Sequence, residues 1–339
     1  MKIYYCFLIL FLIFIVCSCS EQRKIKIARK NYNAGLYTQA FDEYMPLARK
    51  GNPEAQFYIG LMFHEGKGTQ YNLERAFLWL SAAAKKGVPQ AQFNLSLMYS
   101  KGQGVKKNDL LAFRWMEKAA NQELPEALVN LSTFYYSGTV VKKDAKKVFE
   151  LLQVASKQDY PEAQIRLASM YYTGEEIEQN YKTAFEYAQQ AATQNLSAAQ
   201  YMLAIMYIKG KGIPKNTQKG INLLCSSAEN GYELAQIVIS VICLMEGNEK
   251  LAEKWLDQVR EKGIMQELFL DKTSPYILKS IPSLSELKRA LSSIKNKGDS
   301  KMKNSNETIS NDAIQICTYV LDIFSDLRKH ERNRLLPGL

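Results

Sequence analysis

The chain has 339 residues, with 44 lysines and arginines against 34 acidic residues and a formal net charge of +10. Its only histidines are His64 and His330, so a Ser-His-Asp catalytic triad or a Cys-His dyad would have to use one of them. Carboxylates form no periodic pair, and no C-x-x-C spacing is present for a metal or redox site. This composition favours a protein without catalytic residues, metal or cofactor.

Residues 1–18 predict a lipoprotein signal peptide, with a charge at Lys2 and an uncharged run from Ile3 to Val16. That run is shorter than the roughly 20 residues a helix needs to cross a bilayer. The sequence Val16-Cys17-Ser18-Cys19 then resembles a bacterial lipobox, which implies cleavage before Cys19 and its acylation. More than one acyl chain, palmitate included, gives stable membrane anchoring. The alternative is a membrane stub with chance cysteines.

After Cys19, residues 19–53 predict an acylated N-terminus followed by a helix pair that caps a helical array. The pattern Gly35-x-Tyr37-x-x-Ala40 marks a tight turn between two helices and resembles that of a tetratricopeptide unit. A terminal repeat is expected to be atypical, and this one lacks the longer loop found downstream.

Residues 54–263 repeat with a period of 36. A fixed period of this length indicates a solenoid, in which each repeat is one supersecondary unit stacked on its neighbours. The residues that recur in register are Ala55, Ala91, Ala127, Ala163, Ala199 and Ala235; Gly66, Gly102, Gly138, Gly174 and Gly210; and Asn72, Asn108, Asp144, Asn180 and Asn216.

Each repeat predicts two helices. In the first copy, the apolar spacing from about 54 to 64 is helical, and Ala76, Leu80 and Ala83 share one face of a second helix. Gly66 and Gly68 supply loop conformations that other residues resist. Asn72 stands where a helix N-cap belongs. The fold class expected is therefore all-α, an α-solenoid of stacked antiparallel helix pairs.

The residues Ile59-Gly60, Tyr99, Gly102-x-Gly104-Val105, Trp79, Trp115 and Ala119-Ala120 occur in a pattern that resembles the Sel-one-like repeat family, a relative of the tetratricopeptide repeats. The resemblance implies a right-handed superhelix that binds other proteins and performs no chemistry of its own. It covers five full copies and a sixth, degenerate copy that starts at Glu233.

The C-terminal part departs from the repeat. Residues 264–296 predict a helical cap, because Ser283 and Glu286 form a capping-box pattern ahead of an apolar helix. The sixth copy's first helix is apolar nearly all round, so this cap is expected to pack on it. Residues 297–311 predict a flexible linker and 312–339 an amphipathic helix, which either docks on the solenoid or binds a partner. Whether Cys225 and Cys243 form a disulfide stays open.

A candidate partner-binding stripe follows from comparing the copies. In repeats of this kind the first helix lines the concave side, and its core positions keep their type from copy to copy. Other positions on the same helix vary in chemistry and share one face. The alternative is that variation merely marks solvent exposure. The stripe consists of Tyr58, Leu61, Asn94, Leu97, Lys101, Asn130, Thr133, Arg166, Ser169, Met202, Ile205 and Lys209.

A second candidate is a basic ridge in the interhelix loops, which stacking would align against an anionic surface. Its alternative is an ordinary solvated loop edge. The ridge consists of Lys106, Lys107, Lys142, Lys143, Lys211 and Lys215.

The function expected is a membrane-anchored, non-catalytic scaffold for protein–protein interactions in the bacterial cell envelope, with host-cell contact as one role. Ser20 in place of Asp after the lipobox cysteine implies an outer-membrane lipoprotein in a Gram-negative cell. Nucleic acid is not an expected partner. The alternatives are a peptidoglycan- or β-lactam-related binding protein or hydrolase, and a structural spacer without a ligand.

Overall fold

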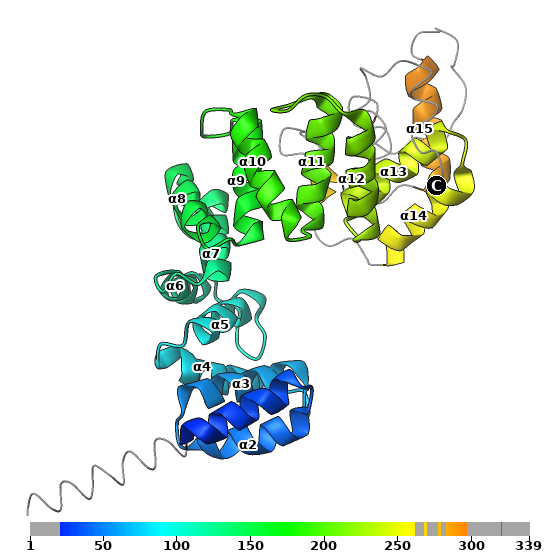
Figure 1. The fold of residues 1–339 in the computed structure, drawn as a ribbon. Coiled ribbons are helices and arrows are strands. Elements are labelled where there is room, and N and C mark those ends of the chain that lie inside the picture. The colour runs from blue at the N-terminus through cyan, green and yellow to red at the C-terminus, as the bar shows by residue number, and fades with distance from the viewer. Residues whose placement is uncertain (1–20, 262–267, 270–276, 279–282, 297–319, 321–339) are drawn as a thin grey trace, which may run out of the picture. The chain divides into compact units, whose positions relative to one another are not determined.

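The computed structural model describes residues 21–261, 268–269, 277–278, 283–296 and 320. The predicted signal peptide, the linker 297–311 and the C-terminal helix, apart from Val320, lie outside the described residues. The chain divides into two compact units, residues 1–158 and 159–339. Each unit is built from helix pairs, and the prediction of an all-α solenoid is confirmed (Figure 1).

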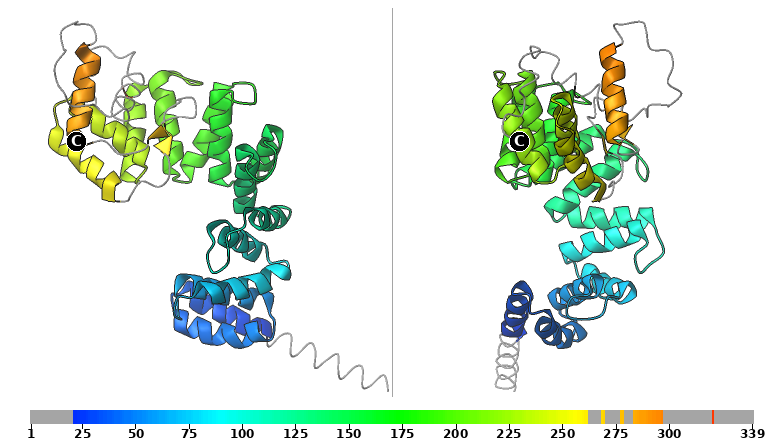
Figure 2. Two further views of the ribbon diagram at one scale, coloured as in Figure 1. Left: turned by 180° about the vertical axis from the view of Figure 1, so that it is seen from behind. Right: turned by 90° about the vertical axis from the view of Figure 1, so that its right-hand side faces the viewer.

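In the first unit, a helix over residues 21–33 is followed by seven more, and the two helices of each repeat pack on one another. The first helix lies against α3 as well as α2, as the blue segments of Figure 2 show. The bounds are α2 (Tyr37–Arg49), α3 (Pro53–Glu65), α4 (Leu73–Lys85), α5 (Pro89–Lys101), α6 (Asp109–Ala120), α7 (Pro125–Ser137) and α8 (Ala145–Ser156).

In the second unit, three helix pairs are followed by two short paired strands and a last helix, α15, that contacts α14. The strands are antiparallel, with Leu268 opposite Leu278. The bounds are α9 (Pro161–Thr173), α10 (Tyr181–Thr193), α11 (Ser197–Lys209), α12 (Thr217–Glu229), α13 (Glu233–Met245), α14 (Glu249–Glu261), β1 (Leu268–Phe269), β2 (Ile277–Leu278) and α15 (Leu284–Asn296).

The loop inside each repeat is fixed by its ends. The first helix of each of the five copies ends at a glycine in the left-handed conformation, of which Gly66 (φ 68°) is the first. The second helix begins at an Asn or Asp whose side-chain oxygen accepts a hydrogen bond from the amide three residues on, as Asn108 does from Leu111 at 2.9 Å. The predicted loop glycine and the predicted N-cap residue are therefore both confirmed. The N-cap oxygen satisfies a helix-terminal amide that would otherwise lack a hydrogen-bond partner.

The core of each pair depends on small residues. Ala55 and its five equivalents down to Ala235 are all completely buried. Gly60 lies so close to α4 that an added Cβ would meet Leu80 Cγ at 2.7 Å. The equivalent residues in the other copies, Ser96, Ser132, Ala168, Ala204 and Ser240, are also small and buried. Small side chains let the two helix backbones approach closely, and the apolar residues around them then pack without gaps.

Glutamines link neighbouring repeats. Gln92 is buried in α5 and donates to the carbonyl oxygen of Ala84 at 3.2 Å, one helix earlier. Its own oxygen accepts from Gln122 at 2.8 Å, at the end of α6. Gln56 and Gln236 repeat the first of these bonds. These carbonyl oxygens also accept a loop amide, as Ala84 does from Gly87 at 3.0 Å, so each glutamine adds a second donor that ties one repeat to the next.

The predicted capping box is present at α15. The Ser283 amide donates to Glu286 Oε2 at 2.7 Å, and the Glu286 amide donates back to Ser283 Oγ at 3.3 Å. Leu287, Ala290 and Leu291 of this helix are buried in one hydrophobic cluster with α13. Among the residues that the structure describes, none of the helices has the length and apolar character needed to cross a membrane.

The loop glycines give a matched test of this architecture. Gly102 (φ 70°) and Gly104 (φ 65°) are both left-handed, but a Cβ on Gly104 would meet the Leu73 carbonyl oxygen at 2.2 Å. A Cβ on Gly102 would meet nothing closer than 3.4 Å. We expect Gly102→Ala to cost about 1–2 kcal/mol of unfolding free energy. Gly104→Ala should cost roughly 1 kcal/mol or more beyond that, because backbone must move.

Urea unfolding followed by circular dichroism measures the difference. Equal midpoints for the two variants would show that the loop does not press on α4.

Candidate functional site

In the first unit, the predicted stripe lies on corresponding faces of α3, α5 and α7, but its first member is a packing residue. The Tyr58 ring stacks on Tyr44, with centroids 4.8 Å apart, and meets the edge of Tyr32 at 5.0 Å. Tyr58 is half-buried. The prediction that this side chain is free of packing is therefore wrong, because the helix of residues 21–33 covers it.

The remaining stripe residues of this unit are partly or fully exposed, and its two asparagines behave alike. Asn94 Nδ2 donates to the Gln90 carbonyl oxygen at 2.8 Å, and Asn130 Nδ2 donates to that of Glu126 at 2.7 Å. Each bond is within the residue's own helix. It fixes the side chain while leaving the amide oxygen as an acceptor. Beside them the stripe offers Leu61, Leu97, Lys101 and Thr133.

One position that the sequence reasoning missed lies a helical turn before the asparagines. Glu126 precedes Asn130 by four residues and therefore shares its face. Its Oε2 atom is buried and has no hydrogen-bond partner in the described part of the chain. The i−4 spacing was the signal that could have found it. The stripe is thus rich in acceptors, with one cation, Lys101, at the end of α5.

In the second unit, the stripe changes character along the chain. Arg166 is exposed on α9, beside Glu162, and Ser169 is partly exposed. Met202 and Lys209 on α11 are half-buried. Ile205 is 7% exposed and belongs to the hydrophobic cluster that includes α13, α15 and Val320. A partner cannot reach Ile205, so its assignment to an accessible stripe is wrong.

The basic ridge residues all lie in the loops between first and second helices, and several have local partners. Lys107 forms an ion pair with Asp109 at 3.5 Å. Lys143 lies over the Tyr136 ring at 5.5 Å and Lys211 over the Tyr181 ring at 4.7 Å. Lys106, Lys142 and Lys215 are exposed. Contacts of this kind orient the ammonium groups and each contributes about 1 kcal/mol or less.

Cys225 and Cys243 are both free thiols in the structure. Burial raises the pKa of Cys225 to about 11 and that of Cys243 to about 12. Both thiols are therefore protonated at neutral pH, and a protonated thiol is a poor nucleophile. They pack as small apolar groups in the second unit. Cys19 and Cys317 lie outside the described residues.

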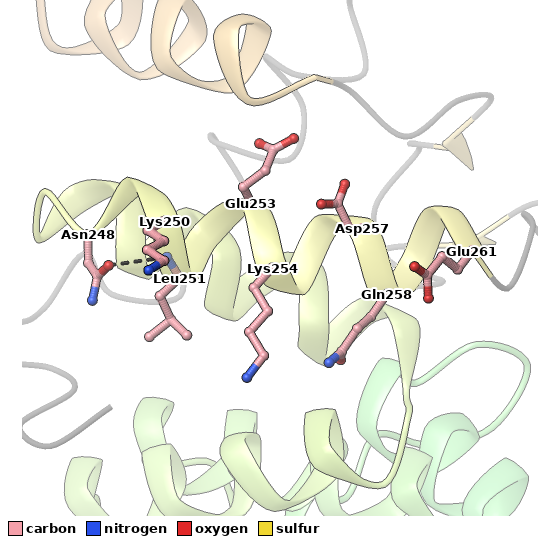
Figure 3. Close-up of a pocket in the computed structure, with 8 residues that line it drawn as sticks. All are labelled: Asn248, Lys250, Leu251, Glu253, Lys254, Asp257, Gln258 and Glu261. Carbon is pink, nitrogen blue, oxygen red and sulfur yellow. Dashed lines mark hydrogen bonds between the residues drawn. The ribbon is translucent and has the colours of Figure 1, made fainter.

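A pocket runs along α14, and Figure 3 shows its lining. Glu253 and Asp257 point to one side of the helix, and Lys254 and Gln258 to the other. Arg260 Nη1 holds both carboxylates, at 2.8 Å each. These acids are ion-paired and do not converge on a common point with the remaining lining residues. The full lining is Asn248, Lys250, Leu251, Glu253, Lys254, Asp257, Gln258 and Glu261.

The described residues contain no group of three His, Cys, Asp or Glu side chains placed to hold a metal ion. His64 is the penultimate residue of α3 and lies at a repeat position that the other copies fill with Ser100, Tyr136, Tyr172 and Ile208. The acceptor-rich stripe of α3, α5 and α7 is thus the candidate site that the geometry supports best. Its chemistry suits recognition of hydrogen-bond donors.

The sequence matches the family model described as Sel1 repeat five times in succession, at residues 53–88, 89–124, 125–160, 161–196 and 197–232. These matches cover more than half of the chain and confirm the predicted five full copies to within one residue. The sixth helix pair, α13 and α14, lies beyond them. Proteins built from this repeat are generally non-catalytic scaffolds that bind protein partners. A search of curated protein sequences gives no match.

Solved structures agree with the family model. A Sel1 repeat protein from Oxalobacter formigenes is 29% identical, with a TM-score of 0.65, over 70% of this chain and 99% of that one. The protein c5321, described as a protective antigen of uropathogenic Escherichia coli with an SLR fold, is 24% identical with a TM-score of 0.61. That match covers 93% of this chain and 67% of the other, and shows the fold alone.

The stripe's two kinds of residue respond differently to truncation. We expect Tyr58→Ala to lower the free energy of unfolding by about 2–3 kcal/mol, because it removes a half-buried ring from an aromatic stack. Asn94→Ala should stay within about 0.5 kcal/mol of the parent, since the lost bond is local and alanine is the better helix former. Thermal unfolding followed by circular dichroism separates them. A Tyr58→Ala protein with the same melting temperature as the parent would contradict the packing role of Tyr58.

Proposed function

The chain belongs to the Sel1 repeat family, and from this premise we propose that it is a non-catalytic scaffold that binds a protein partner along the stripe of α3, α5 and α7. The observation that carries the proposal is the pair Asn94 and Asn130. Both occupy the same repeat position, both are locked by their own helices, and both keep an acceptor oxygen. A regular array of acceptors suits the backbone N–H groups of an extended polypeptide.

The neighbouring residues refine the partner's chemistry. Glu126, which is partly exposed one helical turn before Asn130, adds a negative charge that favours a cation or hydrogen-bond donor on the partner. Lys101 is exposed at the end of α5 and favours an acidic side chain at one end of the bound segment. Leu61 and Leu97 supply apolar contacts between these polar groups. The partner is therefore an extended segment of mixed polarity.

We further propose that acyl chains on Cys19 hold this scaffold in the bacterial cell envelope, as an outer-membrane lipoprotein. The support is the lipobox-like sequence that ends at Cys19, after an uncharged run too short to cross a bilayer. Anchoring places the repeats close to the membrane, where a solenoid can gather envelope proteins or, on the outer face, contact a host cell.

The partner proposal is tested by capture from native envelopes. The double variant Asn94→Ala/Asn130→Ala should bind the stoichiometric partner roughly five-fold to a hundred-fold more weakly than the parent and recover correspondingly less of it, because each lost hydrogen bond contributes about 0.5–1.5 kcal/mol. Asn222→Ala is the matched control, since Asn222 is exposed on the second helix α12. Unchanged recovery by the folded double variant would transfer the assignment to the loop lysines Lys106 and Lys142.

The anchor proposal is tested with radiolabelled palmitate. Cys19→Ala should abolish incorporation and leave the protein uncleaved or soluble, because no thiol remains at the cleavage site. Cys17→Ala should incorporate label as the parent does. Equal labelling of the Cys19→Ala protein would contradict the lipoprotein assignment.

A further inference from the structure

The helix α13 is buried on every side, which its position in the fold does not require. Ten successive residues, from Leu234 to Cys243, are buried. The most extensive helix contacts of α13 are with α12 and α14, and residues of α11 share its hydrophobic cluster. Elements outside the repeats also join this cluster and complete the burial of α13.

The covered face is the one that the preceding repeats leave open. Val238 and Val241 stand at the stripe positions of α13, five periods after Tyr58 and Leu61, and both are 0% exposed. Ile205, at the same position in α11, is 7% exposed. The corresponding residues Leu97 and Thr133 of the first unit are partly or fully exposed and do not form such an apolar surface. The switch from a polar to an apolar stripe thus coincides with its burial.

Among the described residues, those that join this cluster from outside the helix pairs are Leu287, Ala290 and Leu291 of α15, together with Val320. Val320 is helical and 0% exposed, although it is more than 50 residues beyond the last repeat. In the sequence it is the centre of an apolar pattern, Ile316, Val320, Phe324 and Leu327, with helical spacing. A single deeply buried residue at the centre of such a pattern marks the apolar face by which the segment docks.

We propose that the chain's own segment 312–329 docks through Val320 on the apolar stripe of α11 and α13. By repeat position, this is the second unit's equivalent of the surface that, in the function proposed above, the first unit presents to partners. The occupant is fixed by the burial of Val320 in the same cluster as Val241 and Ile205. The apolar character of α13 fits a helix laid into a groove. The stripe of this chain then has two parts, a polar one that is open and an apolar one that is filled.

The test compares Val320→Asp with Thr318→Asp in the full-length protein, by hydrogen–deuterium exchange. Thr318 lies two residues from Val320, off the apolar pattern, so it receives the same new charge without entering the cluster. We expect Val320→Asp to speed amide exchange in α11 and α13 by about tenfold or more, because their cover is displaced, while α3 to α7 keep parental rates. Thr318→Asp should exchange as the parent does.

A peptide of residues 312–330, added in trans to the Val320→Asp protein, should restore the lost protection, whereas the same peptide carrying Val320→Asp should not. Val320→Ala gives the same pattern at smaller amplitude if the charged variant unfolds. Parental exchange of α13 in both Val320 variants, or a folded Val320→Asp protein that the wild-type peptide does not protect, would overturn the proposal.

Discussion

Every repeat of this protein depends on the close approach of its two helices. The approach requires a small residue wherever one backbone crosses the other, and Gly60 with its Ser and Ala equivalents meets that requirement in each copy. The alanines at Ala55 and its equivalents, five residues earlier, are also completely buried. Since interiors are packed as densely as crystals, a larger side chain at these positions would separate the helices and disturb the neighbouring interface as well. The loops, caps and glutamine bonds all serve a geometry that this contact sets.

The repeat geometry could be predicted from the sequence because its signals involve residues close together in the chain and recur in every copy. Gly66 ends a helix in a left-handed conformation that suits glycine, and Asn72 begins the next by accepting an orphan amide. Each signal involves residues within a few positions of one another. Because it recurs at a fixed period, it is not a chance match. The capping box at Ser283 was predictable for the same reason.

The state of the candidate site was less predictable, because it depends on neighbours outside the period. Tyr58 and Asn94 stand at the same repeat position. Tyr58 is covered since the helix of residues 21–33 brings Tyr32 against it, whereas Asn94 is partly exposed and bonds to Gln90 of its own helix. Ile205 varied in type as a surface residue does, yet it is buried in a hydrophobic cluster that α15 and Val320 also join. Variation between copies identifies positions that the repeat does not constrain. It does not say whether a non-repeated segment covers them.

The two ends of the array solve the same physical problem with different residues. A solenoid helix buries its faces only on adjacent repeats, so the outermost units need a cover of other sequence. At the start, the cover is aromatic: Tyr44 stacks on Tyr58, and Tyr32 meets the Tyr58 ring edge-on. At the end it is aliphatic, with Leu287, Leu291 and Val320 around α13. Between them, the polar stripe needs no cover, because Asn94 and Asn130 donate to their own helices and stay solvated. A surface that satisfies its own donors can stand open to water without aggregating, and it still has acceptor oxygens for a polypeptide that supplies N–H groups. The open polar stripe and the covered apolar ends are thus consequences of one constraint, the burial that each repeat obtains from its neighbours.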